Sequence, residues 1–261
     1  MKNLFIILIN FSCILHYTMN TSIQPNITTI EIVYEDDVLL AVNKPNNYLI
    51  HHSNYAKNIE EITLLEKLQQ QLGYQLYPVH RLDRKTSGII LLLKNKEFMP
   101  QFQELFTNNT IHKTYYAIVR GFSPKTGKVD SPVKNDDTGV YKEALTNYQT
   151  ICGIELDIPV TPYDKSRYSL MKLMPETGRM HQLRKHMNKI NHPIVGDYKY
   201  GDRFHNRMFE TEFNCNYLFL HAYQIEFTHP LSHQKMSLTA GFPLDWLLIF
   251  NVFNWNINEN R

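Results

Sequence analysis

Apolar positions along the chain follow two periods, one typical of strands and one typical of helices. Alternating or continuous apolar runs predict strands within residues 30–34, 38–43, 89–93, 113–119, 168–173 and 218–227. Helical spacing predicts one helix over residues 98–106 and an earlier one that ends at Gly73, with a shared face of Ile62, Leu65, Leu68 and Leu72. Strands outnumber helices and do not alternate regularly with them, which favours an α+β fold over a doubly wound parallel sheet.

Composition sets limits on the class of protein. With 261 residues, 43% of them hydrophobic and 12% aromatic, the chain can fill the core of one large domain or two small ones. A formal net charge of only +2 excludes a generally polycationic coat for nucleic acid, so such contacts need local patches. One basic cluster qualifies, although a solvated helix face explains it equally well. It comprises Arg179, Arg184, Lys185, Lys189, Lys199, Arg203 and Arg207.

Cysteine and histidine positions do not indicate a metal or a disulfide framework. The three cysteines are scattered without a C-x-x-C pair, which fits a reducing compartment. His181 and His186 are five residues apart and miss the one-turn spacing of a helical zinc pair. We therefore expect no metal site.

The segment 79–88, VHRLDRKTSG, sets one carboxylate, Asp83, among four basic or imidazole side chains. A predicted buried strand follows, so Asp83 is expected on a loop that a rigid neighbour anchors. If the backbone there is extended, Arg81 and Lys85 lie on the same side as Asp83. Nearby cations favour the ionised carboxylate, the form that a nucleophile or electrostatic stabiliser needs. A surface ion pair closing a turn has the same composition, so chemistry alone makes Asp83 only a candidate.

Four segments in order resemble the RluA-type pseudouridine synthases. Residues 80–88 (HRLDRKTSG) are similar to the family's central HRLDxxTSG motif, which surrounds one catalytic aspartate. Residues 37–45 (DVLLAVNKP), 113–121 (KTYYAIVRG) and 175–201 (PETGRMHQLRKH, then HPIVGD and YG) are similar to the other motifs. The resemblance covers roughly residues 28–245. It implies an isomerase that converts a uridine of RNA to pseudouridine, with a mixed, mainly antiparallel central sheet and surrounding helices.

The resemblance also implies roles for individual residues. Asp83 is the catalytic residue, Tyr115 stacks against a uracil turned out of the helix, and Arg184 pairs with the catalytic carboxylate. Arg81 fills the gap left by the extruded base or binds phosphate. Further RNA or pocket contacts are expected from Lys44, Lys113, Arg179 and His181.

The implied reaction needs neither a cofactor nor a metal, because it involves no redox change and no group carrier. Asp83 attacks C6 of the base or C1′ of the sugar, or stabilises a sugar cation, and the sequence leaves these alternatives open. A glycosidase would need two carboxylates facing one bond, and we expect no second acidic residue of the motifs to pair with Asp83. A stacked base must first be flipped into a pocket.

Residues 159–170 and the motif that follows are most similar to the tRNA pseudouridine synthase C subtype, which acts on uridine 65 in the T stem of tRNA. RNA, and tRNA in particular, is therefore the expected partner, without a membrane or an obligate protein partner. A synthase acting on ribosomal RNA is the main alternative, and a noncatalytic RNA-binding module is a second. The turn-rich insertion 153–167 is either an RNA contact or a plain hairpin loop.

The N-terminal residues do not fit the family pattern. Residues 4–15 are apolar like a secretory signal, but they are shorter than a membrane span and lack an A-x-A-like cleavage site. We expect residues 1–27 to be an apolar extension, or the true start to be Met19. Residues 28–261 are then the catalytic domain, without a separate N-terminal RNA-binding domain. An exported enzyme would not meet tRNA, so the expected location is cytoplasmic.

Overall fold

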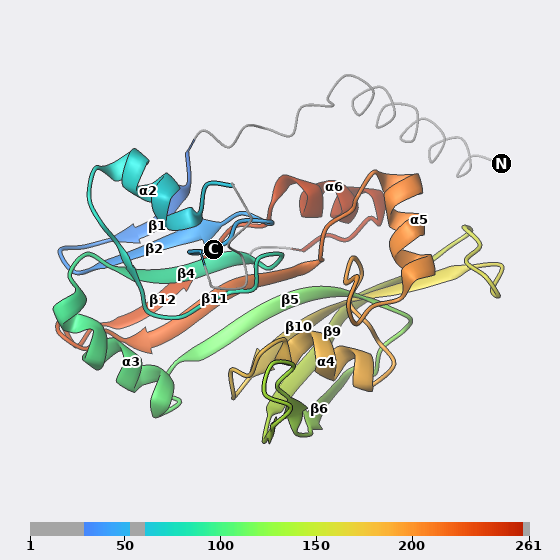
Figure 1. Cartoon of the computed structure of the whole chain (residues 1–261). Helices are drawn as coiled ribbons and strands as arrows, with labels where there is room; N and C mark the ends of the chain where they lie inside the picture. The colour runs from blue at the N-terminus through green and yellow to red at the C-terminus, as the bar shows by residue number, and fades with distance from the viewer. Residues whose placement is uncertain (1–28, 53–60, 258–261) are drawn as a thin grey trace.

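The computed structural model describes residues 29–52 and 61–257, and the expected extension 1–27 lies outside the described residues. Its main feature is a ten-stranded sheet with the order β1-β2-β4-β11-β5-β10-β9-β6, in which β12 also pairs with β11 and β3 with β4 (Figure 1). The bounds are Glu31–Glu35 (β1), Leu39–Lys44 (β2), Tyr77–Pro78 (β3), Ser87–Leu93 (β4), His112–Arg120 (β5), Thr126–Asp130 (β6), Leu145–Leu156 (β9), Ser166–Pro175 (β10), Leu220–Thr228 (β11) and Lys235–Thr239 (β12). Strands β7 (Val133–Lys134) and β8 (Tyr141–Lys142) form a separate hairpin.

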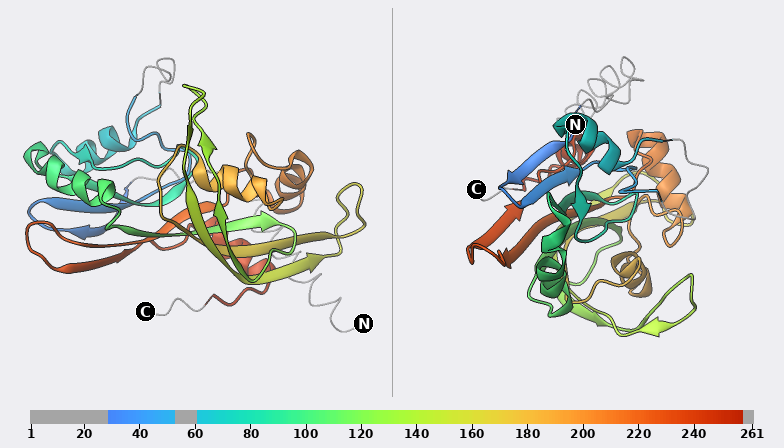
Figure 2. Two further views of the ribbon diagram at one scale, coloured as in Figure 1. Left: turned by 90° about the horizontal axis from the view of Figure 1, so that it is seen from below. Right: turned by 60° about the vertical axis from the view of Figure 1, so that its left-hand side comes forward.

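Helices pack on both faces of this sheet. They are α2 (Leu64–Leu72), the short η1 (Lys96–Phe98) with α3 (Met99–Thr107), α4 (Gln182–Lys189), α5 (Arg203–Phe213) and α6 (Leu244–Val252). The left view of Figure 2 shows α2, α3, α4 and α5 above the sheet and α6 below it, with the β7–β8 hairpin rising between the two groups of upper helices. No helix in the described part of the chain is both long and apolar enough to cross a membrane.

The predicted α+β class with a mainly antiparallel sheet is confirmed. Among the described main-sheet strands, β4 and β11 make a parallel pair, and the other pairs are antiparallel. Each predicted strand and both predicted helices are present at their places. Gly73 ends α2 in the left-handed region, with φ 82°. The predicted face of α2 is wrong at Ile62, which is 51% exposed because the helix begins only after the capping residue Thr63.

Two neighbouring parts of the hydrophobic core fix the helices around the loop that precedes β4. Under α2 and α3, Leu68 and Phe102 pack on the apolar strands β2 and β4 and are fully buried. Beside them, Met187 of α4 packs against β5 and β10 through Ala117 and Met171. Helix α4 is thereby fixed next to the loop that precedes β4. Segments about 100 residues apart in the sequence therefore meet at one place.

Candidate active site

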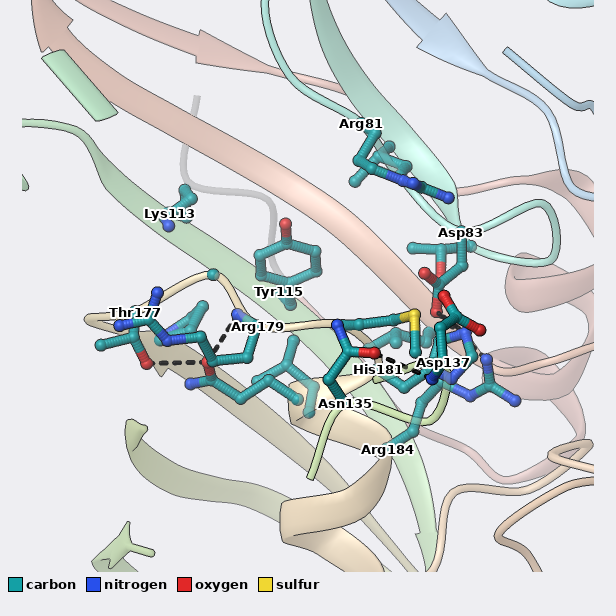
Figure 3. Close-up of a pocket in the computed structure, with 18 residues that line it drawn as sticks. Arg81, Asp83, Lys113, Tyr115, Asn135, Asp137, Thr177, Arg179, His181 and Arg184 are labelled. Carbon is teal, nitrogen blue, oxygen red and sulfur yellow. Dashed lines mark hydrogen bonds and ion pairs between the residues drawn. The ribbon is translucent and has the colours of Figure 1, made fainter. Parts of the chain in front are cut away.

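A pocket of about 300 Å³ opens where the loop before β4 meets β5, the end of β10 and the start of α4 (Figure 3). This volume lies at the lower end of the range for small-molecule sites, roughly 300–1,000 Å³. Most of the residues singled out from the sequence line it, and Lys44 is the exception. The lining residues from that set are Arg81, Asp83, Lys113, Tyr115, Arg179, His181 and Arg184.

The loop that carries Asp83 turns sharply instead of running extended. The backbone N–H of Thr86 donates to the carbonyl oxygen of Asp83 at 3.0 Å, which closes a turn. This turn breaks the expected alternation. In the described structure Asp83 makes an ion pair with Arg184 and lies 3.6 Å from His181 Nε2, and no ion pair joins it to Arg81 or Lys85.

Lys44 holds this loop from behind. Its ammonium donates to the carbonyl oxygens of Pro45 at 2.8 Å, Tyr48 at 3.1 Å and Arg84 at 2.9 Å, and the residue is 0% exposed. Burial lowers the pKa of Lys44 to about 7, against the opposing effect of the negative charge on Asp83. The predicted RNA contact of Lys44 is wrong, because all three N–H bonds are used inside the protein.

Gly88 fixes the strand that follows the loop. It has φ 110°, and a Cβ atom there would lie 2.2 Å from the carbonyl oxygen of Ala222. The absence of a side chain lets β4 approach β11 closely in their parallel pairing. Beside it, the Ser87 hydroxyl lies 2.9 Å from Nδ1 of buried His221. The close packing of β4 at Gly88 therefore limits the movement of the loop that carries Asp83, five residues earlier.

Arg184 contacts Asp83 and is itself anchored by a second carboxylate. Its Nη1 donates to Asp83 Oδ2 at 3.1 Å, whereas Nε and Nη2 donate to the two oxygens of Asp197 at 2.7 and 2.8 Å. The bidentate pair fixes the plane of the guanidinium and aims its remaining edge at Asp83. The predicted contact between Arg184 and Asp83 is present.

Asp197 is the functional residue that sequence reasoning missed. It lies in the HPIVGD motif, so the motifs do hold a further acidic residue, but its partner is Arg184 and not Asp83. Asp197 is 2% exposed and also accepts from the backbone N–H groups of Lys199 and Tyr200. Burial raises the pKa of Asp197, but its bonds to Arg184 and to these N–H groups outweigh burial and leave the pKa below its usual value. Because it lies behind the guanidinium, Asp197 orients Arg184 and does not face a bond opposite Asp83.

Tyr115 stands in the pocket on β5 with its hydroxyl pointing away from the strand (Figure 3). Burial raises the pKa of its phenol, and the charge of Asp83 raises it further, so the hydroxyl stays neutral. Lys113 lies two residues earlier on the same face of β5, and burial lowers its pKa. Tyr116 points to the opposite face, where its ring packs edge-on to Tyr223 with centroids 5.0 Å apart.

His181 closes the pocket beside Asp83. It caps α4 in a left-handed conformation with φ 55°, which is uncommon for a residue with a side chain. Its Nε2 lies 3.6 Å from Asp83 Oδ2, and its Nδ1 lies 2.9 Å from the Tyr200 hydroxyl. Burial lowers the pKa of His181 and outweighs the effect of Asp83, so the ring is neutral near pH 7. Arg179 is exposed at the rim, where its Nε donates to the carbonyl of Glu143.

Comparison with known proteins identifies the class of this site. The family model described as RNA pseudouridylate synthase matches residues 38–189. The tRNA pseudouridine synthase C of Pasteurella multocida is 39% identical, and the match covers 88% of this chain and 99% of that protein. The chain belongs to the RNA pseudouridylate synthase family.

Two further comparisons support this family assignment. The tRNA pseudouridine synthase C of Vibrio cholerae is 37% identical over 87% of this chain and 96% of its own length. The structure of human RNA pseudouridylate synthase domain containing 1 has a TM-score of 0.67 at 24% identity, over 85% of this chain and 87% of that one, and shows the common fold. The predictions of an RluA-type synthase and of an isomerase are confirmed.

The turn-rich insertion lies far from the pocket of this pseudouridylate synthase. Residues 153–156 continue β9, and residues 157–165 connect it to β10. Strand β10 runs from Ser166 to Pro175, which lines the pocket, so the loop is about 30 Å away at about 3.3 Å per residue. Lys165 pairs there with Glu155 and Asp157. The segment is a hairpin loop between β9 and β10, and an RNA contact there stays a prediction.

The described residues hold no group of three or more His, Cys, Asp or Glu side chains placed to bind a metal ion. Around Asp83, the pocket of the pseudouridylate synthase instead brings together a partly exposed carboxylate, the guanidinium of Arg184, the imidazole of His181 and the aromatic ring of Tyr115. This set suits a flat uncharged base next to an anionic reactive group. Asn135 and Asp137, from the segment between β7 and β8, also line the pocket, and no motif or spacing in the sequence predicts their presence there.

Proposed function

We propose that this protein isomerises a uridine of tRNA, uridine 65 in the T stem, and that Asp83 is its catalytic residue. The observation that supports this proposal best is the position of Asp83, which lines the pocket with Tyr115 and is hydrogen-bonded to Arg184. The tRNA substrate is proposed because the curated relatives are named tRNA pseudouridine synthase C. The position within tRNA comes from the resemblance of residues 159–170 to that subtype.

The reaction exchanges one glycosidic bond for another within the same nucleotide. The N1–C1′ bond breaks, the uracil ring turns, and a C5–C1′ bond forms, after which C5 loses a proton and N1 gains one. Atoms and electrons balance, so no cofactor takes part in our proposal. Asp83 acts on C6 of the base or C1′ of the sugar, or it stabilises a sugar cation. Arg184 donates to the carboxylate and aims it at the pocket, with Asp197 behind the guanidinium.

Entry into the pocket requires the uridine to leave the stem. We assign the stacking surface for the flipped uracil to Tyr115, and the role of filling the vacated space or of binding phosphate to Arg81. Arg81 is exposed beside Asp83, where it can reach the RNA. Lys113, Arg179 and His181 are the proposed RNA or pocket contacts.

We further propose that residues 28–261 act as one catalytic domain in the cytoplasm, where tRNA is found, without a membrane or an obligate protein partner. Mass spectrometry of the native protein from fractionated cells tests the role of residues 1–27. A processed chain found outside the cytosol would overturn this part of the proposal.

Pseudouridine maps of cellular RNA test the substrate directly. Deleting the gene is expected to remove the modification at tRNA position 65, and re-expression of the wild-type chain, but not of Asp83→Asn, is expected to restore it. Loss of a site in ribosomal RNA with unchanged tRNA would favour the ribosomal alternative. Unchanged maps in both RNAs, together with RNA binding by the pure protein, would favour a noncatalytic module.

A further inference from the structure

His181 lies between Asp83 and a second carboxylate, Asp136. Lys185, Lys199 and Tyr200 surround Asp136 and form what we call the second anion site. One carboxylate oxygen of Asp136 accepts from Lys185 Nζ at 2.6 Å. The other accepts from the Lys199 ammonium and the Tyr200 hydroxyl, and His181 Nδ1 lies 3.7 Å from it. These donors strongly lower the pKa of Asp136. Two cations and a hydroxyl thus converge on a single carboxylate.

The three donors, Lys185, Lys199 and Tyr200, are held by α4 and by the buried Asp197. Lys185 is on α4, and the backbone N–H groups of Lys199 and Tyr200 donate to buried Asp197 at 2.9 and 3.0 Å. The charged ends of Lys185 and Lys199 also lie 5.4 and 5.3 Å from the centroid of the Tyr200 ring. The same Asp197 orients Arg184 toward Asp83, so the second anion site and the catalytic carboxylate share one support.

Asp136 itself comes from a projecting element. It lies in the turn of the β7–β8 hairpin, in which residues 136–142 are exposed. The turn is held by its own contacts, since Asn135 Oδ1 accepts from the backbone N–H groups of Asp137 and Thr138. The side chains of Asn135 and Asp137 line the pocket. The bonds of Asp136, together with a bond from Lys185 Nζ to the carbonyl oxygen of Lys134 at 2.6 Å, therefore hold the hairpin over the pocket rim.

We propose that Lys185, Lys199 and Tyr200 bind a phosphodiester of the RNA next to the flipped nucleotide, and that Asp136 occupies this site in the free enzyme. A phosphodiester, like a carboxylate, presents two acceptor oxygens that share one negative charge, so the same donors fit it. RNA that displaces Asp136 also removes the bonds of the hairpin turn to Lys199 and Tyr200, which loosens the turn at the entrance for the base. This inference rests on the proposed function in RNA modification.

The test compares Asp136→Asn with Asp164→Asn, which removes the same charge from an exposed position in the loop between β9 and β10. Affinity for an unmodified tRNA transcript is measured over about 50–300 mM KCl, where each phosphate contact on a duplex contributes about 0.9 to the slope of log K against log salt. Asp136→Asn is expected to bind at least about threefold more tightly than Asp164→Asn, because RNA no longer competes with the internal carboxylate. Adding Lys199→Gln to Asp136→Asn is expected to abolish this gain.

A second comparison keeps the hairpin intact. Lys199→Gln alone is expected to bind the transcript more weakly and with a smaller salt slope, by about 0.9, than Lys125→Gln, which removes an exposed charge elsewhere. Equal affinities and slopes within each matched pair would overturn the phosphate site. Pseudouridine formation by the wild-type enzyme is followed in parallel. An inactive wild type would count against the proposed function, whereas an active wild type with unchanged binding in the variants would reject the phosphate site alone.

Discussion

Replacing Asp197 by alanine tests whether the catalytic geometry depends on a buried anchor. The change leaves the guanidinium of Arg184, whose side chain is 9% exposed, with only its single bond to Asp83. Removing one partner of a buried ion pair costs about 3–5 kcal/mol, because the other charge stays buried and unpaired. The backbone N–H groups of Lys199 and Tyr200 also lose an acceptor, at about 1 kcal/mol each. Since Asp83 compensates in part, we expect a loss of about 3–4 kcal/mol in the free energy of unfolding.

Activity should fall together with stability. An unanchored Arg184 can turn toward Asp83, and a shift of about 1 Å in a reacting group can reduce the rate roughly 100-fold. Urea denaturation gives the free energy of unfolding, and single-turnover pseudouridine formation gives the rate. The control is Asp157→Asn, which removes a carboxylate whose side chain is 88% exposed and should change stability by less than about 0.5 kcal/mol. If Asp197→Ala behaved like this control in both assays, the anchoring role would be refuted.

The pH dependence of stability provides an independent readout of the same anchor. The pKa of Asp197 is lower in the folded protein than in the unfolded chain, where an aspartate has a pKa of about 3.9. Its contribution is therefore fully present above about pH 4 and is lost as the pH falls through the lowered folded value. Asp197→Asn should lose less stability than the wild type over that acid range. Parallel curves for the two proteins would contradict this assignment.

Two further substitutions test the pocket and its support. Tyr115→Ala should weaken binding of a tRNA transcript roughly five- to 150-fold, which corresponds to the loss of about 1–3 kcal/mol of stacking. Tyr115→Phe keeps the ring and should bind within about threefold of the wild type. Equal losses of affinity in the two variants would argue against a stacking role. Lys44→Met should destabilise the fold by about 1–3 kcal/mol and lower kcat more than it raises KM, because the carbonyls around the Asp83 loop lose their donor. The exposed control Lys125→Met should do neither, and a Lys44→Met protein with unchanged kcat would show that the loop holds its position without the lysine.

The sequence predicts the strands well because their apolar pattern is local. Residues 89–93 are apolar without interruption, and β4 is buried at every position from Ser87 to Leu93. Helix α6, Leu244–Val252, is apolar at most positions, so it has no polar face that would reveal the helical period. The long strand β9 was also missed, because polar and apolar residues are mixed along Leu145–Leu156.

The sequence predicted which residues form the candidate site but not the hydrogen bonds and turns that position them. The motifs identified Asp83, Tyr115 and Arg184, and the structure brings all three to one pocket. Neither the turn at Asp83 nor the pairing of Arg184 with Asp197 could be predicted, because each depends on residues that are distant in the sequence or on the exact path of the backbone.

His80 illustrates how composition can mislead within a motif. It stands among the basic residues around Asp83, yet its Nε2 accepts from the backbone N–H of Leu91 at 3.0 Å. Burial lowers the pKa of His80 to about 3, so the ring is a neutral structural acceptor near pH 7. The charge that matters to Asp83 instead comes from α4, about 100 residues later in the sequence.

The most direct test of the central claim is single-turnover pseudouridine formation by Asp83→Asn on an unmodified tRNA transcript, with binding measured in parallel. The substitution preserves the shape of the side chain and removes its charge and nucleophilicity. We predict no detectable product and a transcript affinity within about threefold of the wild type, since Tyr115 and the proposed RNA-binding side chains remain. Product formation at the wild-type rate would contradict the assignment of Asp83 as the catalytic residue.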